Sequence, residues 1–191
     1  MANYLKATII AMIGFLSVFT SLAQNVPAGV YLRVVIIRHG EKPDTGNNLS
    51  CTGLNRALAL LAVLDTVTGK PDFTYVPKIK IGDTTSSIRM FQTVTPFAIQ
   101  QNLYINSSFK ETDHKGAARD VLTRKGMVLM VWEHTNIPPL ATALGVPGKL
   151  KWSGKDFDSI WIIDFVSTPK GLQFSKFTIE QENINPSSTC P

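Results

Sequence analysis

Two of the three histidines in the chain, His39 and His134, occupy places where a side chain can do chemistry. His39 follows a β-branched run and stands in the sequence Arg38-His39-Gly40. A guanidinium can bind phosphate oxygens and neutralise their charge, while an adjacent imidazole can attack phosphorus. Gly40 permits a sharp turn and the close approach of a ligand. An Arg-His pair by itself is also compatible with an ordinary surface loop.

His134 repeats the arrangement of His39. It follows the apolar run 127–132, is preceded by Glu133, and comes directly before a predicted helix whose N-terminus favours anions. In open α/β sheets, ligands bind beyond the carboxyl ends of the strands, which is where both histidines fall. The sequence therefore predicts one pocket that contains both. The alternative for His134 is a helix-capping or core histidine.

The other polar residues have less definite environments. Arg89 stands in the segment 86–93 at a predicted helix start, and on its own it would be a solvated arginine. Glu41 is expected to pair with an arginine, and His114 to be solvated in a polar loop or helix start. No Gly-rich phosphate loop, metal-ligand cluster or Ser-His-Asp order is present in the sequence, so no metal or cofactor is expected.

Alternating strands and helices are predicted to position these residues. The alternation indicates one α/β domain with a mostly parallel central sheet, which could carry an antiparallel edge. Buried strands are predicted at 33–37, 73–76 and 127–132, and late strands at 159–166 and 173–180 around a hairpin turn at 169–171. Helices are predicted from Ser50 or Thr52 to Gly69, over 86–102 with a kink or start at Pro96, near 114–125 and over 137–144.

Both ends of the chain are expected to lie outside this domain. Residues 1–23 combine one early lysine, an apolar stretch and small residues at positions 21 and 23, the pattern of a secretory signal peptide. A retained membrane anchor is the alternative, but polar and helix-breaking residues interrupt the uncharged run after position 24. The domain is expected to span 24–181, with a flexible tail over 182–191. Secretion or export to a periplasm follows, without a stable membrane anchor.

Composition excludes several other classes of protein. The chain has 191 residues with 19 Lys+Arg, 14 Asp+Glu and a formal charge of +5, an ordinary globular balance. The basic residues are spread along the chain, which does not indicate nucleic-acid binding. Two cysteines are too few for a Cys-rich zinc module. After export, Cys51 and Cys190 can form a disulfide; the alternative is a buried Cys51 and a free Cys190.

Taken together, the motifs resemble the histidine phosphatase superfamily, which includes phosphoglycerate mutases and acid phosphatases. The resemblance covers most of residues 33–166 and is closer to the small, phosphoglycerate-mutase-like branch. It implies a three-layer α/β/α sandwich. The matching segments are Arg38-His39-Gly40 at a strand end, Leu49-Ser50-x-x-Gly53 after that loop, Arg89 with Gln92-Thr93-x-x-Pro96 behind it, and Glu133-His134 in a late strand-to-helix turn.

The resemblance implies a two-step phosphoryl transfer. His39 would attack phosphorus to form a phosphohistidine, which water then hydrolyses. Arg38, Arg89 and His134 would hold the phosphoryl oxygens as negative charge moves onto them. Attack requires a neutral His39, so its other ring nitrogen should meet a backbone carbonyl or a similar acceptor.

The motifs leave the proton donor for the leaving group open. Phosphoglycerate-mutase-like members carry a donor Glu in a helical segment after the second arginine, but residues 97–112 hold only Glu111 and no clear counterpart. Glu133 is the preferred donor, which requires a raised pKa. A carboxylate that orients His134 or Arg38 is the alternative role for Glu133, and Glu41 is a competing donor.

The resulting hypothesis is an exported phosphatase that hydrolyses small phosphomonoesters. A non-catalytic or weakly catalytic phospho-ligand-binding protein is one alternative, because the usual donor is missing. A protein phosphohistidine phosphatase is the other, because its good leaving group needs less help from an acid. The sequence does not indicate an oligomeric state.

Overall fold

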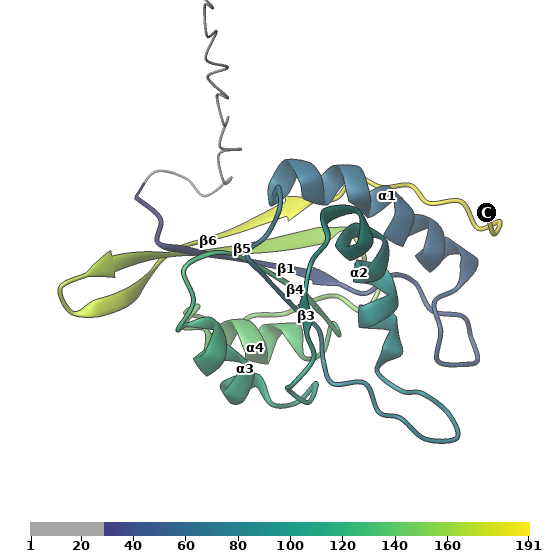
Figure 1. Cartoon of the computed structure of the whole chain (residues 1–191), viewed down its shortest axis with the longest axis horizontal. Coiled ribbons are helices and arrows are strands. Elements are labelled where there is room, and N and C mark those ends of the chain that lie inside the picture. Colours follow the sequence, from purple (N-terminus) through teal and green to yellow (C-terminus); the bar gives the residue numbers. More distant parts are fainter. Residues whose placement is uncertain (1–28) are drawn as a thin grey trace, which may run out of the picture.

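A six-stranded sheet with helices on both faces forms the structure, a computed structural model that describes residues 29–191 (Figure 1). The proposed signal peptide at 1–23 lies outside the described residues. The elements are, in chain order, β1 (Leu32–Arg38), α1 (Cys51–Val67), β2 (Phe73–Tyr75), α2 (Ile88–Gln101), β3 (Ile105–Asn106), α3 (His114–Val121), β4 (Gly126–Trp132), α4 (Ile137–Ala143), β5 (Ser159–Thr168) and β6 (Gly171–Gln181).

The sheet is mixed and has the order β3-β2-β4-β1-β5-β6. The first four strands of this order run parallel, while β5 and β6 form an antiparallel edge. Arg38 at the end of β1 lies opposite Trp132 at the end of β4. The loops that follow β1 and β4 consequently project from the same end of the sheet, the right-hand end in Figure 1. This end carries the predicted site.

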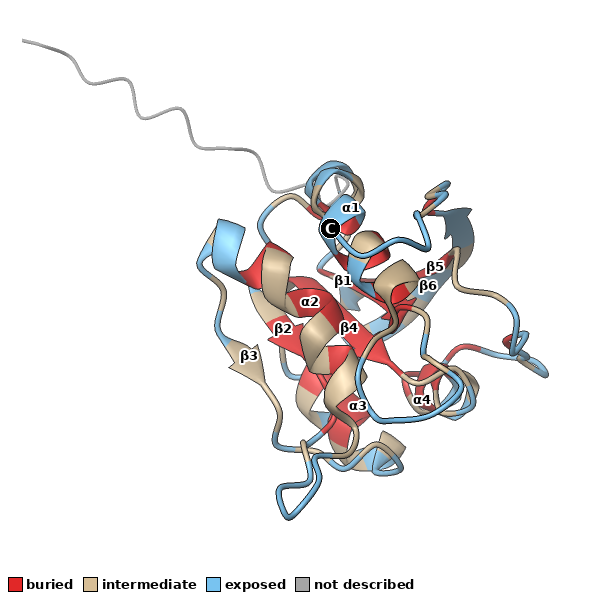
Figure 2. Cartoon of the chain, turned by 90° about the vertical axis from the view of Figure 1, so that its right-hand side faces the viewer, coloured by how far each residue is buried: buried red, intermediate tan, exposed pale blue. Residues whose placement is uncertain are grey.

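Two layers of helices cover the sheet. Alternate side chains of β1 point to opposite faces, as strand geometry requires. Val35 packs with buried residues of α1 and α2, and Val34 packs with buried residues of α3 and α4. Figure 2 shows the buried residues gathered along β1, β4 and the helix surfaces turned toward them. The three-layer sandwich is therefore confirmed, with a more extensive antiparallel part than an edge strand alone.

The predicted elements differ from the structure in details that have local causes. β3 has only two residues, too few to leave a periodic signal in the sequence. Pro96 lies inside a continuous α2 and does not start a helix. No helix within the described part of the chain is long and apolar enough to cross a membrane.

The segment after β6 is attached to α1, which corrects the expectation of a flexible tail. It contains no helix or strand, as its polar, Pro-containing sequence suggests. However, Glu182 is buried with its Oε2 atom 2.6 Å from Nη1 of Arg56. The amide of Asn55 donates to two carbonyls near the C-terminus, and Cys190 forms a disulfide with Cys51. These contacts join residues more than 120 positions apart, so local composition could not show them.

Candidate active site

The two histidine-bearing turns lie side by side at the carboxyl ends of β1 and β4. The backbone N–H of His39 donates to the carbonyl of Trp132 at 3.1 Å, which continues the parallel pairing beyond the strands. His39 is buried, with only 2% of its surface exposed, whereas His134 is half-buried. The structure therefore brings the first histidine against the strand that leads into the second.

Direct backbone contact with α1 fixes the turn after His39. A Cβ atom on Gly40 would lie 2.7 Å from the carbonyl oxygen of Gly53, and one on Gly53 would lie 2.2 Å from that of Glu41. Ser50 caps α1 by accepting a hydrogen bond from the N–H of Gly53, and its own N–H donates to the Glu41 carbonyl. The spacing Ser50-x-x-Gly53 thus joins the helix start to the turn without room for a side chain.

The imidazole of His39 is held in one tautomer. Its Nδ1 atom lies 2.7 Å from the carbonyl oxygen of Gly40, so Nδ1 carries the proton and donates it. Burial lowers the pKa of His39 to about 4, and the positive charges of Arg38 and Arg89 add to this effect. The ring is therefore neutral at physiological pH, with the lone pair of Nε2 free to attack. This is the backbone acceptor that the sequence argument expected.

Arg38 is fixed by a loop from the far end of the chain. Its Nη1 atom donates to the carbonyls of Gly154 at 2.9 Å and Asp156 at 2.8 Å. Its guanidinium carbon lies 3.6 Å from the ring centroid of Phe157, whose edge also faces His39. Burial lowers the pKa of Arg38 to about 10, which leaves it charged at neutral pH. The side chain is thus a rigid, desolvated cation beside the imidazole.

Arg89 reaches the same site from α2. Thr93, one turn later, accepts a hydrogen bond from the N–H of Gly40 at 2.9 Å and donates to the carbonyl of Arg89. The charge of Arg89 lowers the pKa of both His39 and Arg38, which is consistent with their proximity. The Nε atoms of Arg38 and Arg89 are buried, and neither has a hydrogen-bond partner among residues 29–191. Both guanidinium groups can therefore donate to an oxyanion.

Glu133 is placed to orient His134. Its Oε1 atom contacts Nδ1 of His134, and its Oε2 atom accepts from the backbone and hydroxyl of Thr135 and the amide of Asn136. Burial alone would raise the pKa of Glu133, but these hydrogen bonds and His134 outweigh it and lower the pKa. A group that readily ionises is a poor proton donor, so this environment favours the orienting role.

Glu111, for which the sequence showed no clear role as a donor, contacts the segments that carry Arg89 and His134. Its Oε2 atom accepts from the hydroxyl of Ser87 at 3.0 Å, and its Oε1 atom is 3.5 Å from the amide nitrogen of Asn136. Ser87 comes two residues before Arg89, and Asn136 comes two residues after His134. The carboxyl of Glu111 thus connects the segments that carry the second arginine and the second histidine.

Glu41 pairs with an arginine, as expected, and that arginine is Arg56. The carboxylate of Glu41 lies 2.8 Å from Nη2 of Arg56, on the side of α1 that faces away from solvent. Burial raises the pKa of Glu182, on the other side of Arg56, to about 8, despite the opposing charge of Arg56. Glu41 belongs to a buried network behind the His39 turn.

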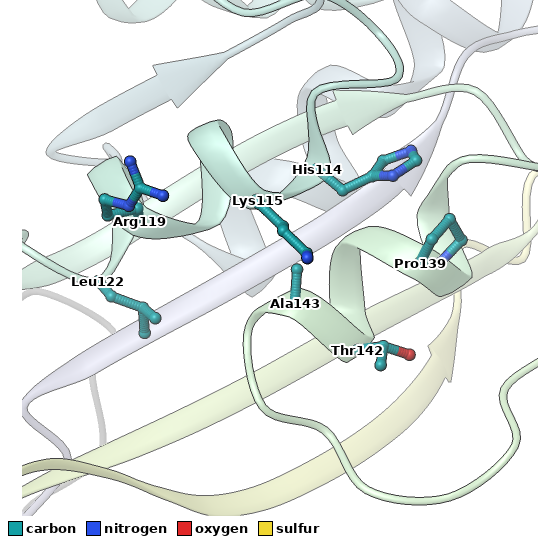
Figure 3. Close-up of a pocket in the computed structure, with 7 residues that line it drawn as sticks. All are labelled: His114, Lys115, Arg119, Leu122, Pro139, Thr142 and Ala143. Carbon is teal, nitrogen blue, oxygen red and sulfur yellow. The ribbon is translucent and has the colours of Figure 1, made fainter.

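His114 is half-buried, so the expectation of a solvated histidine is corrected. It starts α3, and its Nε2 atom lies 2.8 Å from Oδ1 of Asn136, the residue that also contacts Glu133. His114 is one of the residues that line a cavity of about 570 Å³ between α3 and α4, and Figure 3 shows it together with Pro139 of α4. All three histidines therefore lie at the same edge of the sheet, with His114 contacting the turn of His134 through Asn136.

Sequence reasoning missed two contributors to the site. Thr93 lies in the motif after Arg89, but the motif does not show that the Thr93 hydroxyl accepts a hydrogen bond from the N–H of Gly40. Phe157 lies in a loop before β5, and nothing in its sequence context connects it to Arg38 more than 100 residues earlier. Within residues 29–191, no three His, Cys, Asp or Glu side chains gather as potential metal ligands.

Two solved structures of SixA proteins share this architecture. The protein histidine phosphatase SixA complexed with tungstate is 13% identical over 76% of this chain and 95% of its own, with a TM-score of 0.55. A SixA protein from Nakamurella multipartitia is 14% identical over 80% of this chain and 98% of its own, with a TM-score of 0.50. The chain has the histidine phosphatase fold.

Within this fold, the resemblance indicated by the motifs is confirmed for the architecture. Neither a protein-family model nor a curated protein matches the sequence. The roles of individual residues therefore rest on the geometry described above.

Proposed function

We propose that this chain is a phosphatase that acts on phosphomonoesters through a phosphohistidine at His39. The observation that carries the proposal is a buried, neutral imidazole whose Nδ1 proton is held by a backbone carbonyl, which leaves Nε2 unprotonated, with two cationic guanidinium groups close enough to lower its pKa. Those groups belong to Arg38 and Arg89, and their buried Nε donors have no partner among the described residues. A phosphoryl group would supply the missing acceptors and the compensating charge.

The reaction proceeds in two displacements on phosphorus. In the first, the lone pair of His39 Nε2 attacks phosphorus, the P–O bond to the leaving group breaks, and the leaving oxygen takes up a proton. In the second, water attacks the phosphohistidine, the P–N bond breaks, and inorganic phosphate departs as the water gives up a proton. Arg38, Arg89 and His134 stabilise the charge on the phosphoryl oxygens in both steps.

Glu111 is the better candidate for the group that protonates the leaving oxygen. Glu133 has its oxygens occupied by His134, Thr135 and Asn136 and a lowered pKa, which suits positioning. Glu111 has fewer contacts and lies beside the segment that carries Arg89. The same carboxylate can accept a proton from water in the second displacement.

Export is part of the proposal. The pattern over residues 1–23 is that of a secretory signal peptide. The disulfide between Cys51 and Cys190 supports an oxidising location, because such bonds persist mainly outside the cytosol. The proposed activity would then act on phosphorylated compounds in a periplasm or outside the cell.

A protein phosphohistidine phosphatase is the second candidate. It is favoured by the likeness to SixA, which is named as a protein histidine phosphatase. The P–N bond of a phosphohistidine has a better leaving group than an alkyl ester, so it depends less on an acid such as Glu111. The two candidates share His39, Arg38 and Arg89 and differ in their need for that acid.

An assay with three substrates separates these functions. The purified chain is tested on p-nitrophenyl phosphate, on an alkyl phosphate and on a phosphohistidine peptide, with His39→Ala as the inactive control. We expect all activity to require His39. We also expect Glu111→Gln to impair the alkyl ester more than the nitrophenyl ester, because only the alkyl leaving group needs a proton. Glu133→Gln should impair both esters by a similar factor.

The outcomes assign the function. Turnover of the alkyl ester supports the phosphomonoesterase, whereas turnover restricted to the phosphohistidine peptide identifies the second candidate. Absence of turnover on every substrate would contradict both and indicate a phospho-ligand-binding protein. A larger loss on the alkyl ester for Glu133→Gln than for Glu111→Gln would restore Glu133 as the donor.

A further inference from the structure

A cationic cavity adjoins the proposed site on the side of Glu111. It has a volume of about 480 Å³ and is lined by the segments 78–81 and 110–112 and by Ser87. The backbone N–H of Lys78 donates to the carbonyl of Phe109 at 2.7 Å, which holds the first two segments together. The cavity is therefore built from the loops that follow β2 and β3, at the same edge as the histidines.

Three lysines line this cavity, and they are not neutralised by the protein. Lys78, Lys80 and Lys110 are exposed, and none forms an ion pair with a carboxylate among residues 29–191. The one carboxylate in the wall is Glu111, whose oxygens face Ser87 and Asn136. The cavity thus has an excess of positive charge beyond that of Arg38 and Arg89.

The wall of this cavity is shared with the site. Ser87 precedes α2, which carries Arg89, and Glu111 contacts Asn136, two residues after His134. Glu111 is also the proposed donor to the leaving oxygen. A leaving group that receives its proton from Glu111 would consequently extend into the cavity and meet the lysines.

We infer that the cavity lined by Lys78, Lys80 and Lys110 recognises a second anionic group on the leaving-group side of the substrate. The inference deepens the proposed function and rests on it: the substrate class becomes phosphomonoesters whose alcohol carries a carboxylate or another phosphate. The volume suits a small organic acid or sugar phosphate. Because the lysines are exposed, the attraction is screened by salt and moderate in strength.

The test compares ligands that differ in one group. Glycerol 3-phosphate and 3-phosphoglycerate differ only in an alcohol against a carboxylate, while glucose 6-phosphate and glucose 1,6-bisphosphate differ by a second phosphate. Dissociation constants are measured on His39→Ala, which does not consume the ligands, and KM and kcat on the wild-type chain. The binding arm remains informative even if no ester is hydrolysed, so failure of the proposed function is distinguished from failure of this inference.

We expect the ligand with the additional anionic group to bind about tenfold more tightly than its partner in at least one pair in low salt, with the preference reduced in high salt. The triple variant Lys78→Gln, Lys80→Gln, Lys110→Gln should abolish that preference and leave binding of glycerol 3-phosphate within about twofold. The corresponding Lys→Arg variant should retain it. A preference within the glycerol 3-phosphate pair identifies a carboxylate as the recognised group, and a preference within the glucose 6-phosphate pair identifies a phosphate.

A matched control removes three lysines from the opposite edge of the sheet, Lys70, Lys125 and Lys170, which precede β2 and β4 or follow β5. This variant should keep the full preference. Equal binding within both ligand pairs by the unsubstituted cavity would overturn the inference. So would an equal loss in the control variant, because that would show a general effect of net charge.

Discussion

The two histidine-bearing turns end neighbouring parallel strands but are held by different forces. The turn of His39 is buried and packed backbone to backbone against α1, where Gly40 and Gly53 leave no space for a Cβ atom. The turn of His134 is half-buried and is held by side-chain hydrogen bonds through Glu133 and Asn136.

This difference matches the two proposed tasks. A nucleophile must present one nitrogen in one protonation state, and burial with a backbone acceptor achieves both for His39. A group that stabilises phosphoryl oxygens needs direction but less isolation from water, which the polar network around His134 provides. The comparison predicts that perturbing the first turn is far more damaging than perturbing the second.

The largest expected effect separates the two histidines directly. His39→Ala should lower kcat for p-nitrophenyl phosphate by about 10⁴-fold or more, since no covalent intermediate can form. His134→Ala should lower it by only about 10²–10³-fold, the range for loss of one transition-state donor. Steady-state kinetics on both variants, with circular dichroism to confirm folding, makes the measurement. Equal losses would contradict the division of roles.

The packing of the His39 turn against α1 is tested by adding one methyl group at Gly53. Gly53→Ala should reduce the free energy of unfolding by about 3 kcal/mol or more, because its Cβ would lie 2.2 Å from the carbonyl oxygen of Glu41. Alanine normally favours a helix over glycine by about 1 kcal/mol, so the clash must exceed this gain. Urea denaturation reports the change.

Gly82→Ala is the control for this substitution. Gly82 lies in an exposed loop, and the nearest atom to its added Cβ would be 3.9 Å away. The free energy of unfolding of the Gly82→Ala variant should match that of the wild type within about 0.5 kcal/mol. A similar result for Gly53→Ala would show that the turn after His39 can move away from α1.

The sequence predicted the parts of this site that depend on local pattern. Arg38 and His39 follow a continuous β-branched run, and Glu133 and His134 follow an apolar run, so the strand ends and their chemistry are visible together. The supports could not be predicted in the same way. Arg38 is fixed by carbonyls 116 and 118 residues later, and Glu182 reaches Arg56 across 126 residues. Such contacts are decided by packing and not by neighbouring residues.

The buried network behind the first turn should give stability a particular pH dependence. The pKa of Glu182 rises from 4.5 to about 8 on folding, so folding retains a proton that the unfolded chain loses. Its contribution to stability is complete below pH 4.5 and declines as pH increases toward 8. His39 acts in the opposite direction between about 4 and 6.5, so the interval above pH 6.5 is the most informative.

Glu182→Gln should flatten the decline of unfolding free energy between pH 6.5 and about 8. Denaturant titrations at several pH values in that interval provide the measurement. Glu180→Gln, an exposed position on β6, should leave the decline unchanged. An identical pH slope in wild type and Glu182→Gln would contradict a protonated Glu182 behind the turn.

The mildest test changes no residue and measures the pKa of His39 by varying the pH. The ring resonances of His39 should show a pKa of about 4, well below its usual 6.5, because the imidazole is buried between cationic side chains. Nuclear magnetic resonance with His39→Asn for assignment gives this value. A midpoint near 6.5 for His39 would mean that water reaches the ring and would contradict its burial.

The covalent intermediate tests the central claim most directly. The chain is mixed with p-nitrophenyl phosphate, quenched in alkali to preserve P–N bonds, and the peptide that contains His39 is analysed by mass spectrometry. The account predicts a phosphoryl group on His39 during turnover, its absence in His39→Ala, and its persistence in His134→Ala. Turnover with the phosphoryl group on another residue, or with no adduct under conditions where hydrolysis of the intermediate is rate-limiting, would contradict it.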